Sequence, residues 1–167
     1  MLTYIECGRI INTHGVRGEV KIEPWCDSPE VFLTFREVYM EKNGTYRKVG
    51  IKSRLGGKHL IASLEGVEDM DTAITLKGVT LYAHRDAIPV PEGEMLLCDM
   101  IGLPVIDANS GVTYGTLSRI EDGAASTLYY VKTDKGEVIL PAVPAFIKEV
   151  SPAGVMVTPI SGFFDEV

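Results

Sequence analysis

Apolar and polar residues alternate in short runs near the start of the chain. From Val20 to Trp25, valine and isoleucine take turns with glutamate and lysine, the period of two expected of a half-buried strand. The run from Ile5 to Ile11 is also rich in apolar residues. Gly15 and Gly18 lie between the two runs and suit a loop whose backbone reaches φ > 0. We therefore predict a strand, a structural glycine turn and a second strand.

The rest of the N-terminal half has four more runs with strand character. They are Glu37 to Met40, Tyr46 to Ser53, Leu60 to Leu64 and Val79 to Tyr82. Asn43-Gly44 separates the first two runs and is typical of a tight hairpin turn. We therefore predict six strands in this half of the chain.

Only two segments of this half have a helical pattern. Glu68 to Gly78 has acidic residues in its first turn and ends at a glycine, as helices commonly do. A short helical turn is predicted to begin at Pro29, with Asp27 or Ser28 as its cap. Because strands and helices do not alternate repeatedly, we predict a small β-barrel rather than an α/β sheet.

The C-terminal half also consists of short strands, separated by turns rich in Gly, Pro, Asn and Asp. The predicted strands are Leu103 to Asp107, Val112 to Ile120, Thr127 to Thr133, Glu137 to Leu140, Lys148 to Val150 and Val155 to Thr158. Residues 86–93 contain two prolines and a glycine and are predicted to form a linker. The expected fold is therefore all-β, with two small domains in tandem, residues 1–85 and 94–167.

Charge is divided unevenly between the two halves of this 167-residue chain, whose formal net charge is -7. Residues 1–90 have 12 Lys and Arg against 12 Asp and Glu, whereas residues 91–167 have 4 against 11. The acidic half is expected to prefer a basic protein to nucleic acid. Residues 42–59 contain six basic residues and no acid, which suits contact with RNA phosphate. An ordinary solvated face is the alternative for this window.

The sequence has no recognisable catalytic or metal-binding group. The three histidines lack suitably spaced partners, and the three cysteines have no Cys-x-x-Cys spacing. We expect no catalytic residue, metal, cofactor or small-molecule substrate. Apolar runs stay well below the ~20 residues of a membrane span, and the N-terminus lacks the features of a signal peptide. A cytoplasmic monomer without a membrane partner is therefore expected.

An ordered set of motifs resembles the bacterial ribosome maturation factor RimM family over nearly the whole chain. In the first half the motifs are Gly8-Arg9-Ile10, Thr13-His14-Gly15 and Arg17-Gly18-Glu19-Val20. In the second half they are Asp99-Met100-Ile101-Gly102, Gly115-Thr116-Leu117, Gly123-Ala124, Leu140 to Ile147 and Gly162-Phe163-Phe164-Asp165. The resemblance implies an N-terminal barrel like those of translation factors and a C-terminal PRC barrel.

The resemblance also implies a non-enzymatic function in ribosome assembly. A protein of this family is expected to engage the head of the 30S ribosomal subunit, bind ribosomal protein S-nineteen and promote maturation of 16S rRNA. The candidate RNA contacts are Arg17, Lys48, Lys52, Arg54 and Lys58. An RNA-modifying or hydrolytic enzyme, and a PRC-type scaffold at a membrane complex, are alternatives.

The contacts with a protein partner are expected in the second half. Family members commonly carry aromatic residues immediately before the motif that begins at Asp99, and this chain has methionine and leucine there instead. Such side chains bury well and adapt in shape, so an apolar docking surface is still expected. The candidate partner residues are Met95, Leu96, Leu97, Asp99, Pro144 and Phe146.

Overall fold

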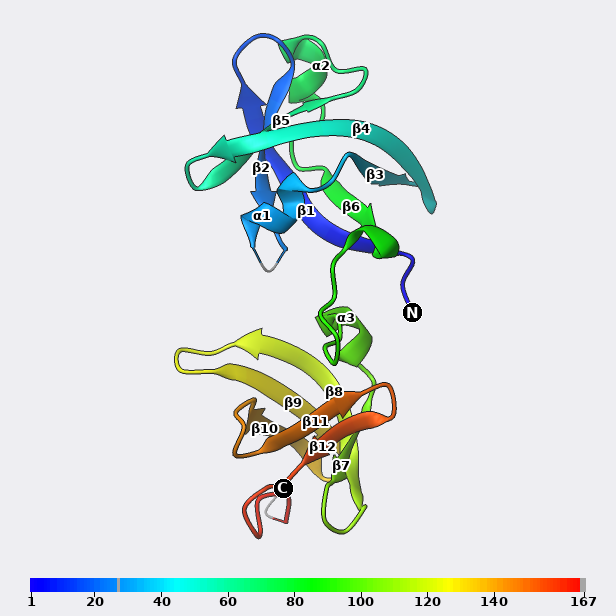
Figure 1. The fold of residues 1–167 in the computed structure, drawn as a ribbon, viewed down its shortest axis with the longest axis vertical. Helices are drawn as coiled ribbons and strands as arrows, with labels where there is room; N and C mark the ends of the chain where they lie inside the picture. The colour runs from blue at the N-terminus through cyan, green and yellow to red at the C-terminus, as the bar shows by residue number, and fades with distance from the viewer. Residues whose placement is uncertain (27, 166–167) are drawn as a thin grey trace. The chain divides into compact units, whose positions relative to one another are not determined.

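The structure is a computed structural model that describes residues 1–26 and 28–165. The chain separates into two compact units, residues 2–89 and residues 90 onward (Figure 1). Each unit has its own cluster of buried apolar side chains.

The first unit is a closed six-stranded barrel. Its strands are β1 (Tyr4–His14), β2 (Glu19–Pro24), β3 (Glu37–Lys42), β4 (Thr45–Gly56), β5 (His59–Leu64) and β6 (Thr80–His84). They pair antiparallel in the order β1-β2-β5-β4-β3-β6, and β6 closes the barrel against β1. The predicted barrel and its strands are confirmed.

Alternation along each strand fills the barrel with apolar side chains. Those that are at most 1% exposed include Ile10, Val20, Ile22, Leu60 and Leu81. Burying a side chain of this size contributes roughly 1.5–3 kcal/mol. The short helix α1 (Pro29–Leu33) adds Phe32, whose ring meets that of Phe35 edge to face at 5.4 Å between centroids. The residues between these buried positions must therefore face outward.

The β1–β2 turn depends on both of its glycines. Gly15 and Gly18 have φ values of 64° and 85°, a region that residues with a Cβ rarely adopt. Gly18 is also buried, and a Cβ there would lie 2.6 Å from the carbonyl oxygen of Val67 and 2.8 Å from the backbone nitrogen of Asp69. The turn therefore packs backbone to backbone against the segment that leads into α2 (Met70–Ile74).

The helix predicted over residues 68–78 is wrong in length, because α2 spans only Met70–Ile74. The Asp69 side chain accepts a hydrogen bond from the backbone N–H of Thr72 (2.7 Å), so the helix begins after Asp69. After the helix, the backbone N–H groups of Thr75, Leu76 and Lys77 each donate to the carbonyl three residues earlier, which is the tighter 3-10 pattern. Gly78 then donates its N–H to Ile10 on β1 at 2.7 Å, which draws the chain out of the helix.

The start of α1 is predicted correctly at Pro29. Ser28 occupies the cap position as predicted, although its side chain makes no capping hydrogen bond. Asp27, the other predicted cap, lies outside the described residues. A 3-10 turn, η1 (Arg85–Ala87), follows β6 and was not predicted.

The second unit is a six-stranded sheet in the order β10-β9-β8-β7-β12-β11. Its strands are β7 (Pro104–Asp107), β8 (Thr113–Asp122), β9 (Thr127–Thr133), β10 (Gly136–Pro141), β11 (Ile147–Ser151) and β12 (Gly154–Val157). The all-β prediction and these strands are confirmed. Two features were not predicted: the parallel pairing of β12 with β7, and the short helix α3 (Leu97–Met100).

Hydrogen bonds to Asp107 hold the turn after β7. One carboxylate oxygen accepts from the backbone N–H groups of Asn109 (2.7 Å) and Ser110 (2.9 Å), and the other accepts from the hydroxyl of Tyr114 (2.5 Å). The Tyr114 ring stacks on Phe164 with centroids 4.1 Å apart. These bonds, that from Tyr114 foremost, lower the pKa of Asp107 to about 2, and the same contact raises the pKa of Tyr114 to about 12.

We expect the substitution Asp107→Asn to destabilise the protein at neutral pH and to have little effect at strongly acidic pH. The folded-state pKa lies below the unfolded value of about 3.9, so ionised Asp107 stabilises the fold above that value. This contribution is lost as the pH falls toward 2. Urea unfolding of both proteins across this range measures the difference, with Asp122→Asn at the exposed end of β8 as the control. A difference that does not change with pH would contradict this role for Asp107.

Candidate functional site

The outer surface of the first barrel is ordered by strand register. Asn12 on β1, Lys21 on β2, Ile61 on β5 and Arg54 on β4 lie opposite one another in one row across four strands. Their inward neighbours, such as Val20, are buried. Side chains that are far apart in sequence therefore share one outer surface.

This surface and the β1–β2 turn gather five cations around two carboxylates. We call the group the basic face: Arg9, Arg17, Lys21, Lys52, Arg54, Glu19 and Glu23. The Arg54 guanidinium donates hydrogen bonds to both carboxylate oxygens of Glu19, with 3.1 Å between Nη2 and Oε2. Arg9 Nη2 lies 3.6 Å from Glu23 Oε2. In residues 1–26 and 28–165, no carboxylate lies within ion-pair distance of Arg17, Lys21 or Lys52. Within this group the five cations outnumber the two carboxylates, and a third carboxylate, that of Glu65, lines a hollow with Lys52 and Arg36 beside it.

Glu19 lies among several basic side chains at the end of this face next to the β1–β2 turn. Its hydrogen bond with Arg54 lowers the pKa of Glu19, and the electrostatic influence of His14 and Arg17 acts in the same direction. Glu19 in turn raises the pKa of Arg54. Arg54 contacts this carboxylate and Arg17 acts on it electrostatically, although the two predicted contacts come from different parts of the chain.

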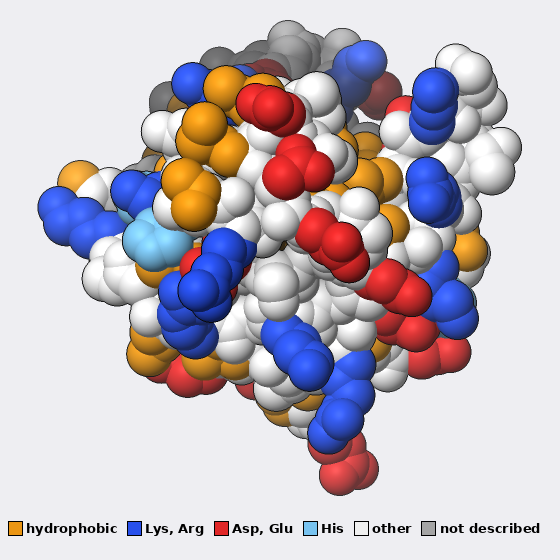
Figure 2. All heavy atoms as spheres, turned by 90° about the horizontal axis from the view of Figure 1, so that it is seen from above, with side chains coloured by type: hydrophobic (Ala, Val, Ile, Leu, Met, Phe, Trp, Pro, Cys, Tyr) orange, Lys and Arg blue, Asp and Glu red, His pale blue; other side chains and the backbone are white. Residues whose placement is uncertain are grey.

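The other predicted RNA contacts are distributed differently. Lys52 lies on β4 with the basic face, but Lys48 pairs with Glu37 on β3, with 3.6 Å between Nζ and Oε2. Lys58 is exposed in the β4–β5 turn, past the last paired row of the hairpin. Seen from the end that carries α2, groups of Lys and Arg side chains are separated by Asp and Glu side chains (Figure 2). The acid-free window of the sequence is therefore not acid-free in space.

Sequence reasoning missed three cations near this surface. Arg9 and Lys21 belong to the basic face, and the alternation along β2 already indicated that Lys21 points outward. Arg36 precedes β3 and lies across a hollow from β4. No pattern in the sequence places Arg36 beside Lys52, because the two residues meet only through the pairing of β3 with β4.

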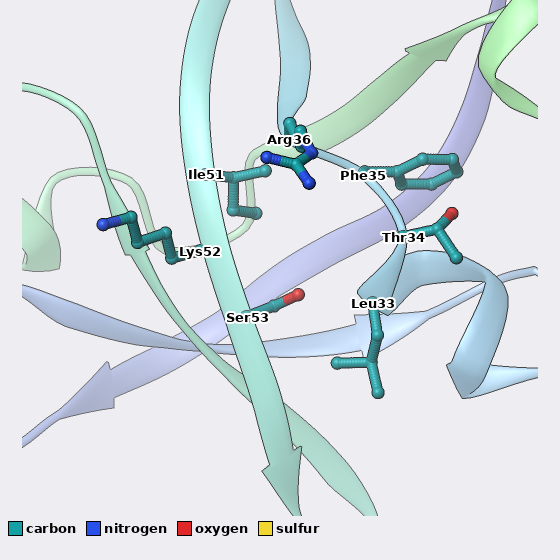
Figure 3. A pocket seen from close by; sticks show the side chains of 7 residues that line it. All are labelled: Leu33, Thr34, Phe35, Arg36, Ile51, Lys52 and Ser53. Atoms are coloured by element: carbon teal, nitrogen blue, oxygen red, sulfur yellow. The ribbon is translucent and has the colours of Figure 1, made fainter.

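That hollow has a volume of about 490 Å³ and no acidic residue in its lining. The lining residues are Leu33, Thr34, Phe35, Arg36, Ile51, Lys52 and Ser53. Figure 3 shows the Arg36 guanidinium and the Ser53 hydroxyl directed into the space between β4 and the segment after α1, whereas Lys52 extends to the other side of β4. Ser53 Oγ is buried and has no hydrogen-bond partner among the described residues. The hollow therefore offers a cation and a free hydroxyl beside the basic face.

The predicted protein contacts lie in the second unit, on and before α3 and between β10 and β11. Leu97 is 54% exposed, and Pro144 is also exposed. The remaining predicted contacts are half-buried: Met95, Leu96, Asp99 and Phe146. Met95 and Phe146 pack against the core, and Phe146 lies 6.0 Å from Phe163 between ring centroids. Ile101, 44% exposed just after α3, adds an apolar side chain that was not predicted.

The described residues contain no cluster of three or more His, Cys, Asp or Glu side chains arranged to hold a metal ion. In the same part of the chain, no helix has the length and apolar character needed to cross a membrane. The Cys7 thiol donates to the carbonyl of Leu81 at 3.3 Å, and its burial raises its pKa. A buried, protonated thiol of this kind is a poor nucleophile.

Comparison with known proteins identifies both units. Residues 5–88 match the RimM N-terminal domain, and residues 92–162 match the PRC-barrel domain. The chain is 34% identical over 154 residues to the ribosome maturation factor RimM of Ruminiclostridium cellulolyticum, covering 90% of each chain. It is 30% identical over 168 residues to that of Clostridioides difficile, covering 98% of each.

A solved structure from Pseudomonas aeruginosa, described as a 16S ribosomal RNA processing protein RimM, is also similar. It is 25% identical in sequence with a TM-score of 0.48, and the match covers 95% of this chain and 98% of that one. The two domain matches together span most of the chain, and the curated relatives align with it nearly from end to end. The chain therefore belongs to the RimM family of ribosome maturation factors.

Proposed function

We propose that the chain is a cytoplasmic, non-enzymatic assembly factor for the 30S ribosomal subunit. It engages the head of that subunit, binds ribosomal protein S-nineteen and promotes maturation of 16S rRNA. Membership of a family whose relatives are named ribosome maturation factors supports this function. The observation that carries the RNA contact is the basic face, where five cations from separate segments meet two carboxylates that arginines already engage.

The basic face suits the phosphate backbone of RNA. Glu19 and Glu23 are held by Arg54 and Arg9, so Lys21 and Lys52 are available for phosphate. Each phosphate contact releases condensed counterions, and the binding constant then falls steeply as salt rises. Arg17 extends this surface along the exposed β1–β2 turn. The hollow beside Arg36 provides further room for an anionic group.

The second unit has the opposite character and suits a basic protein. Residues 91–167 contain 4 basic against 11 acidic residues. Arg119, one of these four cations, lies over the Tyr130 ring at 3.8 Å and pairs with Glu121 and Glu137, each at 3.1 Å. We place the domains at residues 1–85 and 94–167, with residues 86–93 as the linker. The acidic domain would hold its basic partner until competing contacts with rRNA form.

The double substitution Lys21→Glu with Lys52→Glu should weaken association with the 30S subunit by roughly tenfold or more at physiological salt. It reverses two unpaired charges on the basic face and removes no buried side chain. Co-sedimentation with purified 30S subunits measures the loss, and circular dichroism checks the fold. Lys132→Glu with Lys148→Glu makes the same charge change on exposed sites of the second unit and should have a much smaller effect. Equal effects of the two pairs would count against a specific RNA contact at the basic face.

Affinity for ribosomal protein S-nineteen should fall with rising ionic strength, because opposite charges on the two proteins attract each other. Calorimetric titration at low salt and at about 0.15 M salt tests this expectation. Leu97→Ser should weaken binding at both salt concentrations and leave the salt dependence unchanged, since it removes exposed apolar surface and no charge. Binding that does not respond to salt would rule out charge complementarity as the basis of this interaction.

A further inference from the structure

Trp25 is the only tryptophan of the chain, and it lies on the surface. It is 42% exposed just beyond the end of β2, although a ring of this size is usually largely buried. Along β2 it continues the outward series Glu19, Lys21 and Glu23. The exposed indole therefore lies at the end of the basic face opposite the β1–β2 turn.

Several contacts hold the indole in place. Its Nε1–H donates to Glu23 Oε2 at 3.3 Å, and the backbone N–H of Trp25 donates to the carbonyl of Cys7 at 2.9 Å. The Arg9 guanidinium lies 5.9 Å from the ring centroid and 3.6 Å from the same Glu23 oxygen. Glu23 thus orients both the ring and the cation, so less side-chain freedom remains to be lost when a ligand binds.

We propose that Trp25 is a stacking platform for an unpaired nucleobase of single-stranded RNA, with Arg9 and Lys21 contacting the flanking phosphates. This inference rests on the proposed function and specifies which form of RNA the basic face receives. Every base has a flat π-face that can stack on an indole, so the contact tolerates different sequences. Bases inside a duplex are already stacked and paired, so duplex RNA cannot use the ring in the same way.

Local charge favours RNA over a protein as the ligand of Trp25. The Glu23 carboxylate, which contacts the ring, is engaged by both the indole N–H and Arg9. Arg9 lies beside the ring and Lys21 lies on the same outward side of β2, and these cations favour an anionic ligand over the basic proteins of the ribosome. A nucleobase brings its own phosphates and matches both the aromatic and the cationic part of the site.

The single tryptophan makes stacking directly observable by fluorescence. We expect a single-stranded RNA of about ten nucleotides to quench the emission of Trp25 on titration, and the matching duplex to quench it much less. Trp25→Leu should lower affinity for the single strand roughly tenfold or more, whereas Trp25→Phe should keep most of it. Neither substitution should change affinity for the duplex, which depends on phosphate contacts. Thermal melts of both variants establish that they are folded.

The outcomes separate this inference from the proposed function. If Trp25→Leu leaves affinity for the single strand unchanged while Lys21→Glu with Lys52→Glu lowers it, the basic face binds RNA and the stacking platform is refuted. If Trp25→Leu weakens binding of a ribosomal protein and not of RNA, the indole is a protein contact, and the inference is overturned. If the protein binds neither single-stranded RNA nor 30S subunits, both the inference and the proposed function fail.

Discussion

Closure of the first sheet into a barrel is the constraint from which the basic face follows. When β6 pairs with β1, each strand has one buried side and one exposed side, and a slip of one residue would exchange them. Two register shifts in β1 adjust this alternation locally. As a result Arg9 and Asn12, an odd number of residues apart, both lie opposite outward residues of β2. The positions of the cations are thus fixed by the same packing that buries Ile10 and Ile22.

The two halves of the chain differ in their balance of charge. In the first domain Arg9 and Arg54 engage the two acids of the basic face, and Arg17, Lys21 and Lys52 stay available. In the second domain acidic residues outnumber cations, and Glu121 and Glu137 both engage Arg119. Under the proposed function, the first domain binds RNA and the second binds a basic protein. If charge attraction carries both contacts, each should weaken as the ionic strength rises.

Much of the fold could be predicted from the sequence because it is encoded locally. Alternating apolar residues gave the strands, and Asn43-Gly44 gave the β3–β4 turn, where both residues have positive φ. Features that depend on distant segments could not be predicted. The parallel pairing of β12 with β7 and the end of α2, where Gly78 donates to β1, are two examples. The α3 helix is also short enough to leave no periodic pattern.

The candidate site was only partly predictable for the same reason. Residues 42–59 contain no acid, yet the barrel brings Glu19 from β2 to Arg54 and Glu37 from β3 to Lys48. Lys48 is therefore engaged in an ion pair with Glu37, whereas Lys52 stays available, although the sequence alone does not distinguish the two lysines. The sequence predicts Trp25 only as the end of a strand, because its exposure is a property of the folded surface.

The most direct test of whether the protein is a transient assembly factor for the small subunit is sedimentation. The tagged wild-type protein is run through a gradient that separates 30S, 50S and 70S particles. The gradient is run at low and at high salt. We expect the protein to be enriched with free 30S particles, absent from 70S ribosomes and less strongly bound at high salt. Absence from the 30S fraction at both salt concentrations, or equal association with 70S ribosomes, would contradict that function.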